Sequence, residues 1–166
     1  MIRALIEKRN LPLFDVSPNV DLGVSGGNSG FHKSVLACEA LTGFDQIDSV
    51  VLLADNDETP LRSFEMVCHQ INAAKLSGGL SRAWGEITGP AQIGRGDPAV
   101  SVWMWPTANT PGCLESILWE VITAEHPNLA CCVLSAMNCA GTDHWSPNKI
   151  AKARVRCCIS LFCQKN

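Results

Sequence analysis

The fold is constrained most by two short segments that are apolar on both faces. Residues 49–54 read SVVLLA and stop at Asp55-Asn56-Asp57, and residues 100–105 read VSVWMW and stop at Pro106. A strand of this kind is typical of the centre of a parallel sheet. Apolar residues recur at helical spacing around these segments, and such alternation predicts helices on both faces of the sheet. We therefore predict an α/β fold with a small, mainly parallel sheet.

The rest of the chain divides into helices and connections. We expect a helix over Met1–Asn10, an extended segment over Phe14–Val24, and a glycine turn that leads into a helix from Phe31. Residues 76–98 hold six glycines and predict a long flexible connection, with Trp84 either in the core or exposed. The next sequence-predicted helix starts at Thr110-Pro111, and extra helices at the C-terminus span residues 128–139 and follow Ser146-Pro147. Residues 1–166 are expected to form one domain.

Composition limits the classes of function. The net charge is -3, so any attraction to nucleic acid must come from a local basic patch. The charge-free stretch over 127–142 is too short to cross a bilayer, and residues 1–10 lack a signal peptide's apolar centre, which favours a cytoplasmic protein without a membrane partner. Nine cysteines without a CxxC motif indicate no disulfide and no zinc, with Cys68 and Cys158 buried.

Two carboxylates directly follow the first apolar strand. Asp55 and Asp57 are separated by one residue, so both can reach the carboxyl edge of the sheet. Oxygen ligands of this kind suit Mg²⁺, which commonly takes only one or two protein carboxylates. The same residues are also typical of an ordinary Asp/Asn turn before a helix that begins at Thr59-Pro60. If Asp55 and Asp57 form a metal site, the glycine turn and residues 106–112 should lie beside them.

Two further features are candidate phosphate-binding groups. The backbone of Gly26 and Gly27 could approach phosphate at the start of a helix, although a plain turn has the same pattern. Lys152 belongs to a basic stripe with Lys149 and Arg156 on the final helix. This stripe could hold a phosphate backbone, but a solvated cationic face has the same spacing.

Several of these motifs carry a resemblance to a known family. The glycine turn, the VVLLADND strand, the VSVWMWP strand, and Gly112-x-Leu114-Glu115 occur in this order over nearly the whole chain. The chain resembles uncharacterised bacterial and archaeal toprim-related proteins, a branch near the toprim domains of topoisomerases, DnaG-type primases and overcoming-lysogenization-defect nucleases. The resemblance implies a doubly wound α/β unit that binds Mg²⁺ and performs phosphoryl transfer on DNA or RNA.

The resemblance also identifies where the chain departs from the pattern. In the family a Glu closes the first strand and joins the DxD pair as a metal ligand or general acid and base. Residues 1–10 match the helix after that strand, so no residue matches this Glu, and Thr107 stands where relatives tend to have an acidic residue. Glu115 is the candidate catalytic carboxylate, although a solvent-facing glutamate early in a helix is equally compatible with its position.

Two functional hypotheses follow from these residues. The first is a magnesium-dependent phosphoryl-transfer enzyme acting on nucleic acid or a nucleotide, with the metal held by Asp55 and Asp57. The second is a catalytically degenerate toprim-like binding or assembly module. An altered sheet with an uncovered edge would favour a homodimer.

Overall fold

The computed structural model describes residues 30–163, in which three strands form one sheet. β1 (Ser49–Asp55) and β3 (Ala99–Trp105) are parallel over their full length, and β2 (Ile93–Gly94) pairs antiparallel with β3. The α/β class is confirmed. Within the described residues the order β1-β3-β2 makes β3 the central strand and gives β1 one neighbouring strand. An apolar pattern on both faces does not by itself determine how many strands lie beside a strand, so the central position expected for 49–54 is not found among the described residues.

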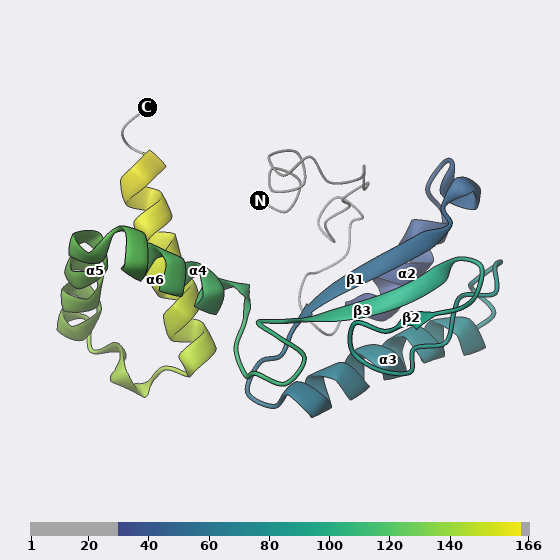
Figure 1. The fold of residues 1–166 in the computed structure, drawn as a ribbon, viewed down its shortest axis with the longest axis horizontal. Coiled ribbons are helices and arrows are strands. Elements are labelled where there is room, and N and C mark those ends of the chain that lie inside the picture. The colour runs from purple at the N-terminus through teal and green to yellow at the C-terminus, as the bar shows by residue number, and fades with distance from the viewer. Residues whose placement is uncertain (1–29, 164–166) are drawn as a thin grey trace.

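The helices form two groups (Figure 1). One group lies against the sheet, and the other lies beyond the carboxyl end of β1. The first comprises α2 (Phe31–Glu39) and α3 (Pro60–Leu76), with the short 3₁₀ helix η1 (Phe44–Gln46) before β1. The second comprises α4 (Leu114–Glu125), α5 (Pro127–Cys139) and α6 (Pro147–Cys163), with the 3₁₀ helix η2 (Thr142–His144) between the last two.

Strand alternation places one face of the sheet in the main core. The even-numbered residues of β1 and β3 lie opposite one another, as in the pair Leu52 and Val102, and pack against α2 and α3. Val67 and Ile71 on α3 are fully buried in this core. On the opposite face Val51 and Trp103 are 44% and 51% exposed within the described residues. The α4–α6 group has a separate core, which includes Val133, Met137 and Cys158.

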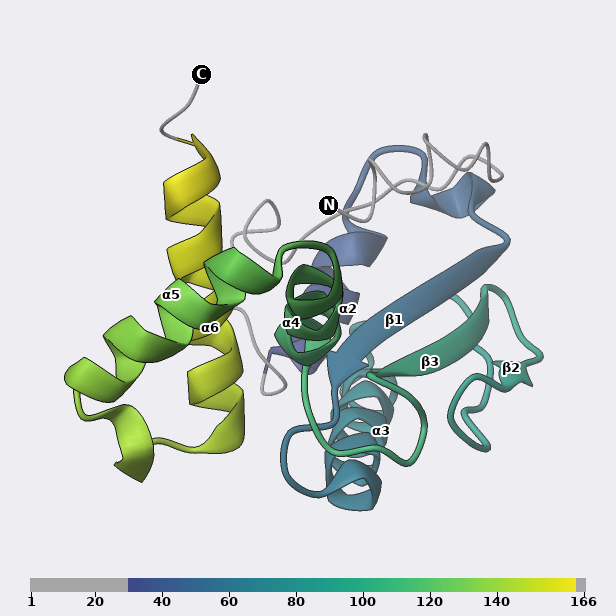
Figure 2. The same ribbon diagram turned by 60° about the vertical axis from the view of Figure 1, so that its left-hand side comes forward.

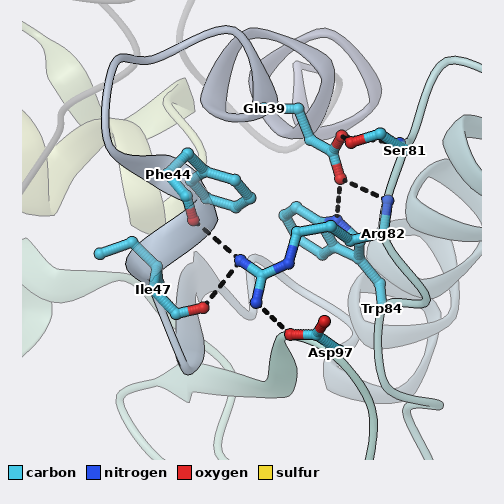
Figure 3. Close-up of polar contacts among 7 residues, drawn as sticks. All are labelled: Glu39, Phe44, Ile47, Ser81, Arg82, Trp84 and Asp97. Carbon is cyan, nitrogen blue, oxygen red and sulfur yellow. Dashed lines mark hydrogen bonds and ion pairs between the residues drawn. The ribbon is translucent and has the colours of Figure 1, made fainter.

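The glycine-rich connection between α3 and β3 is irregular but tied to the core. Trp84 is only 5% exposed and stacks on Phe44 with ring centroids 5.7 Å apart, so it is a core residue. The indole Nε1–H of Trp84 donates to the Glu39 carboxylate, which also accepts hydrogen bonds from Ser81 (Figure 3). Residues 84–88 form no strand, and the short β2 follows them. The buried indole of Trp84, with its hydrogen bond to the charged Glu39, holds this part of the backbone in place without β-sheet pairing.

Arg82 adds a second anchor to the same connection. Its Nη1 donates to the carbonyl oxygens of Phe44 at 2.8 Å and Ile47 at 2.9 Å, and its Nη2 forms an ion pair with Asp97 (Figure 3). Its guanidinium also lies 5.8 Å from the centroid of the Phe44 ring. Arg82 therefore joins the connection to the segment that enters β1.

Other sequence predictions have mixed outcomes. The last helix begins at Pro147 as expected, and Cys158 is buried on its inner face, whereas Cys68 on α3 is only half-buried. The helix expected from Thr110-Pro111 starts instead at Leu114. Predictions for Met1–Asn10, the segment over 14–24, Gly26 and Gly27 lie outside the described residues.

Candidate metal and phosphate site

Asp55 is the last residue of β1 and contacts two helices of the second group. Its Oδ1 accepts a hydrogen bond from the backbone N–H of Leu114, 3.1 Å away, at the start of α4. Its Oδ2 lies 3.7 Å from Nζ of Lys152 on α6. Figure 2 shows α4 beside the end of β1. A carboxylate at a helix N-terminus is favoured because the first N–H groups of a helix have no partner within the helix.

Asn56 is fully buried and holds the turn after β1 in place. Its side-chain Nδ2 donates to the carbonyl oxygens of Thr107 at 2.5 Å and Thr110 at 2.6 Å. Its backbone N–H donates to the carbonyl of Trp105, and its own carbonyl accepts from the hydroxyl of Ser63 on α3. Asn56 therefore ties the turn after β1 to the turn after β3.

Asp57 reverses the chain direction at the edge of the sheet. Its φ of 51° lies in the left-handed region, where Asp and Asn are among the tolerated residues. Its carbonyl accepts from the N–H of Gly112 at 2.7 Å, and its Oδ1 accepts from Nδ2 of Asn148 on α6 at 2.9 Å. The contact between Asp57 and Gly112 confirms that residues 106–112 reach the turn after β1, whereas the glycine turn named in the same prediction lies outside the described residues.

Asp55 is half-buried, and both negative and positive groups act on its carboxylate. Burial raises the pKa of Asp55, while the Leu114 N–H and the charge of Lys152 act in the opposite direction. The carboxylates of Glu115 and Asp57 add repulsion, and the net result is a pKa raised above the ordinary value of an aspartate. Within residues 30–163, Glu115, Asp57 and Lys152 are therefore the charged groups that act on Asp55.

A pocket of about 270 Å³ opens beside Asp57. Among residues 30–163, its lining combines carboxylate, hydroxyl and amide groups with two proline rings, and includes Asp57, Glu58, Pro111, Gly112, Ser116, Pro147 and Asn148. Small-molecule sites are usually concave and mostly apolar, with a few placed polar groups. The pocket therefore offers space next to the acidic turn.

The comparison with protein families places this chain in a group without an assigned activity. The family described as "Protein of unknown function (DUF3226)" matches residues 1–165. The chain belongs to the DUF3226 family. No curated protein and no solved structure matches it. The resemblance to toprim proteins stays a prediction for this DUF3226 chain.

The remaining candidate residues are partly brought together. Lys152 lies beside Asp55, and Glu115 is the second residue of α4, close enough for its charge to act on Asp55. Lys149 lies over the Trp145 ring, with Nζ 4.2 Å from the centroid, and Arg156 is exposed. The basic stripe is thus divided, because Lys152 lies beside Asp55 whereas Lys149 lies over the Trp145 ring. Glu115 lies in the first turn of its helix as expected, but the N-cap of that helix is Cys113 and not Thr110.

Sequence reasoning missed two residues of the site. Asn56 stands between the two aspartates but fills the interior of the turn, and Asn148 begins α6 one turn before Lys152. An asparagine between two candidate ligands was the available signal for the first. The contact between Asn148 and Asp57 joins residues 91 positions apart, and no local pattern indicates it.

The side chains at this turn could bind a magnesium ion, but they would supply only some of its ligands. Within residues 30–163 no three His, Cys, Asp or Glu side chains are grouped so that they could hold a metal. Mg²⁺ commonly keeps several waters and binds through one or two carboxylates, and Asp55 and Asp57 provide that number.

No helix in the described part of the chain is long and apolar enough to cross a membrane.

Proposed function

We propose that this DUF3226 protein binds Mg²⁺ through Asp55 and Asp57 and catalyses phosphoryl transfer on a nucleic acid or nucleotide. The observation that carries the proposal is the position of both aspartates at the carboxyl end of β1, where Lys152 Nζ lies 3.7 Å from Asp55 Oδ2. Ligand sites of open α/β sheets lie at this edge. The resemblance to toprim proteins supports the same chemistry.

Electrostatics supports a divalent cation at this place. The carboxylates of Asp57 and Glu115 raise the pKa of Asp55 further after burial has raised it, so a positive ion would relieve their repulsion. A bound Mg²⁺ supplies neutralisation of the charge on a transferred phosphoryl group. The two aspartates would hold the ion by their carboxylate oxygens, which are acceptors when ionised.

The other residues have distinct roles in this proposal. The side chain of Lys152 is 38% exposed, so its ammonium can turn from Asp55 to a phosphate oxygen. Glu115 is the candidate general acid or base, and its position in the first turn of α4 directs its charge towards Asp55. Gly26 and Gly27 are proposed as backbone donors to phosphate.

A catalytically degenerate binding or assembly module is the second candidate. It is favoured because each aspartate already has partners within the protein, with Lys152 and the Leu114 N–H on Asp55 and Asn148 on Asp57. Thr107, in the segment facing the turn, supplies no further carboxylate. Within the described residues β1 is an edge strand, and an open edge can pair with a second copy.

Titration calorimetry with Mg²⁺ and Mn²⁺ tests the first candidate. The folded wild-type protein should bind one of these ions, and Asp55→Asn and Asp57→Asn should each weaken binding by more than about tenfold, since even outer-shell partners of a metal contribute about 10- to 100-fold. Asp45→Asn is the matched control, because Asp45 is exposed and precedes the opposite end of β1. Absence of binding by folded wild-type protein would reject the enzyme, and a dimer in light scattering would then support the assembly module.

A further inference from the structure

We propose that Asn56 is the positioning residue of this site, which sets the geometry of Asp55 and Asp57 by clamping the turn after β1 onto residues 107–110. The inference rests on the proposed Mg²⁺ site, and it assigns the precision of that site to a side chain that touches no ligand. Asn56 differs from the two aspartates because its side chain points into the protein and is fully buried.

The clamp is made of bonds that only an amide supplies. Two carbonyl oxygens, of Thr107 and Thr110, face one Nδ2 group at 2.5 Å and 2.6 Å, and an amide nitrogen carries two hydrogens for two acceptors. Asp has the same shape but offers no donor when ionised, and Leu offers none at all. The requirement for two donors in one small, planar group therefore selects Asn at this position.

The other polar atom of the side chain, Oδ1, shows that stability alone does not account for this choice. The Oδ1 of Asn56 is buried and has no hydrogen-bond partner within the described residues. A buried acceptor without a donor destabilises a fold, and each such group calls for an explanation. The explanation offered here is that the two Nδ2 bonds hold the turn in the conformation that brings both aspartates to the sheet edge.

The clamped segment leads directly to the donors that contact the aspartates. Thr107 and Thr110 form a bridge with each other, and the chain then reaches Gly112, whose N–H bonds the Asp57 carbonyl. Two residues later the N–H of Leu114 bonds the Asp55 carboxylate. Loss of the clamp would therefore release the 107–114 segment and both of these contacts together.

Amide hydrogen exchange and calorimetry on Asn56→Leu test the inference, with Ser63→Ala as the matched control. Ser63 bonds the carbonyl of Asn56 from α3, so Ser63→Ala removes a different polar contact of Asn56 and leaves its bonds to residues 107–110 in place. In Asn56→Leu we expect faster exchange at Gly112 and Leu114 than at the amides within β1 and β3. We also expect Mg²⁺ affinity to fall by about 10- to 100-fold, as for other outer-shell partners. Ser63→Ala should keep both close to the wild-type values.

The outcomes separate this inference from the proposed function. If Asn56→Leu leaves exchange at Gly112 and Leu114 unchanged, or accelerates exchange equally throughout the sheet, the positioning role is overturned. If wild-type protein binds no Mg²⁺, the proposed function fails, while local release of Gly112 and Leu114 would still support the clamp. If Asn56→Leu does not fold, Asn56→Asp, which keeps the shape and removes both donors when ionised, gives the same readout, and its unchanged local exchange would overturn the role.

Discussion

Arg82 should be among the most important polar residues for stability, because it joins the glycine-rich connection to the entrance of β1. Only 16% of its side chain is exposed, and its Nη1 donates to the carbonyl oxygens of Phe44 and Ile47. A hydrogen bond from a charged donor contributes about 1.5–3 kcal/mol, so the two bonds set an upper bound of about 3–6 kcal/mol. Water can reach the freed carbonyls in a variant, and we expect Arg82→Met to lower the free energy of unfolding by about 2–4 kcal/mol.

Urea denaturation followed by tryptophan fluorescence measures this loss. Met keeps most of the apolar stem that packs beside Phe44, so the difference reports the polar contacts. The control is Asp97→Asn, because the Asp97 side chain is 70% exposed and its ion pair with Arg82 should contribute less than about 1 kcal/mol. The reasoning is refuted if Arg82→Met stays within about 0.5 kcal/mol of the wild type, the range of ordinary surface changes, or if Asp97→Asn has an equal effect.

Two further predictions concern acid stability and the core. Burial alone would raise the pKa of Glu39, but hydrogen bonds from Ser81, Trp84 and Arg82 outweigh it and lower the pKa. Its carboxylate therefore stabilises the fold above the ordinary carboxyl pKa, and this contribution is lost as pH falls through the lowered value. Between pH 7 and pH 3, Glu39→Gln should lose less unfolding free energy than the wild type; equal losses would contradict this linkage. Ile71→Ala should cost about 2–5 kcal/mol by thermal or urea unfolding because Ile71 is fully buried, whereas Leu76→Ala, at an 89% exposed position, should stay within about 0.5 kcal/mol.

Local sequence patterns correctly predicted those helices and strands whose local preference is not overridden by a tertiary contact. The two apolar segments became β1 and β3 with boundaries shifted by no more than one residue, and Pro60 and Pro147 begin α3 and α6. The start of α4 differs because Thr110-Pro111 has a helix-start pattern that a distant residue overrides. The Asn56 side chain donates a hydrogen bond to the carbonyl of Thr110, and Thr110 pairs with Thr107. The helix therefore begins only after its N-cap, Cys113.

The site could be predicted only where strand topology determines it. The rule that strands of a parallel sheet end at one edge was enough to bring residues 106–112 to Asp55 and Asp57. It could not place Asn148, because that contact depends on how the α4–α6 group docks against the sheet. Nor could it reveal that Lys152 of the basic stripe is paired with Asp55, since a helical stripe reports spacing along one helix and nothing about what faces it.

Three consecutive residues, Asp55 at the end of β1 and the two that follow it, make contacts in three directions, and this arrangement explains why the site lies where it does. Asp55 binds the start of α4 and the middle of α6, and Asn56 binds the turn after β3. Asp57, turned by its positive φ, binds Gly112 and the start of α6. The turn therefore joins the sheet, with its own core, to a helical group with a second core. Because Asp55 and Asp57 contact both groups, a ligand bound by them would stabilise the docking of α4 and α6 on the sheet in proportion to its affinity for the docked form.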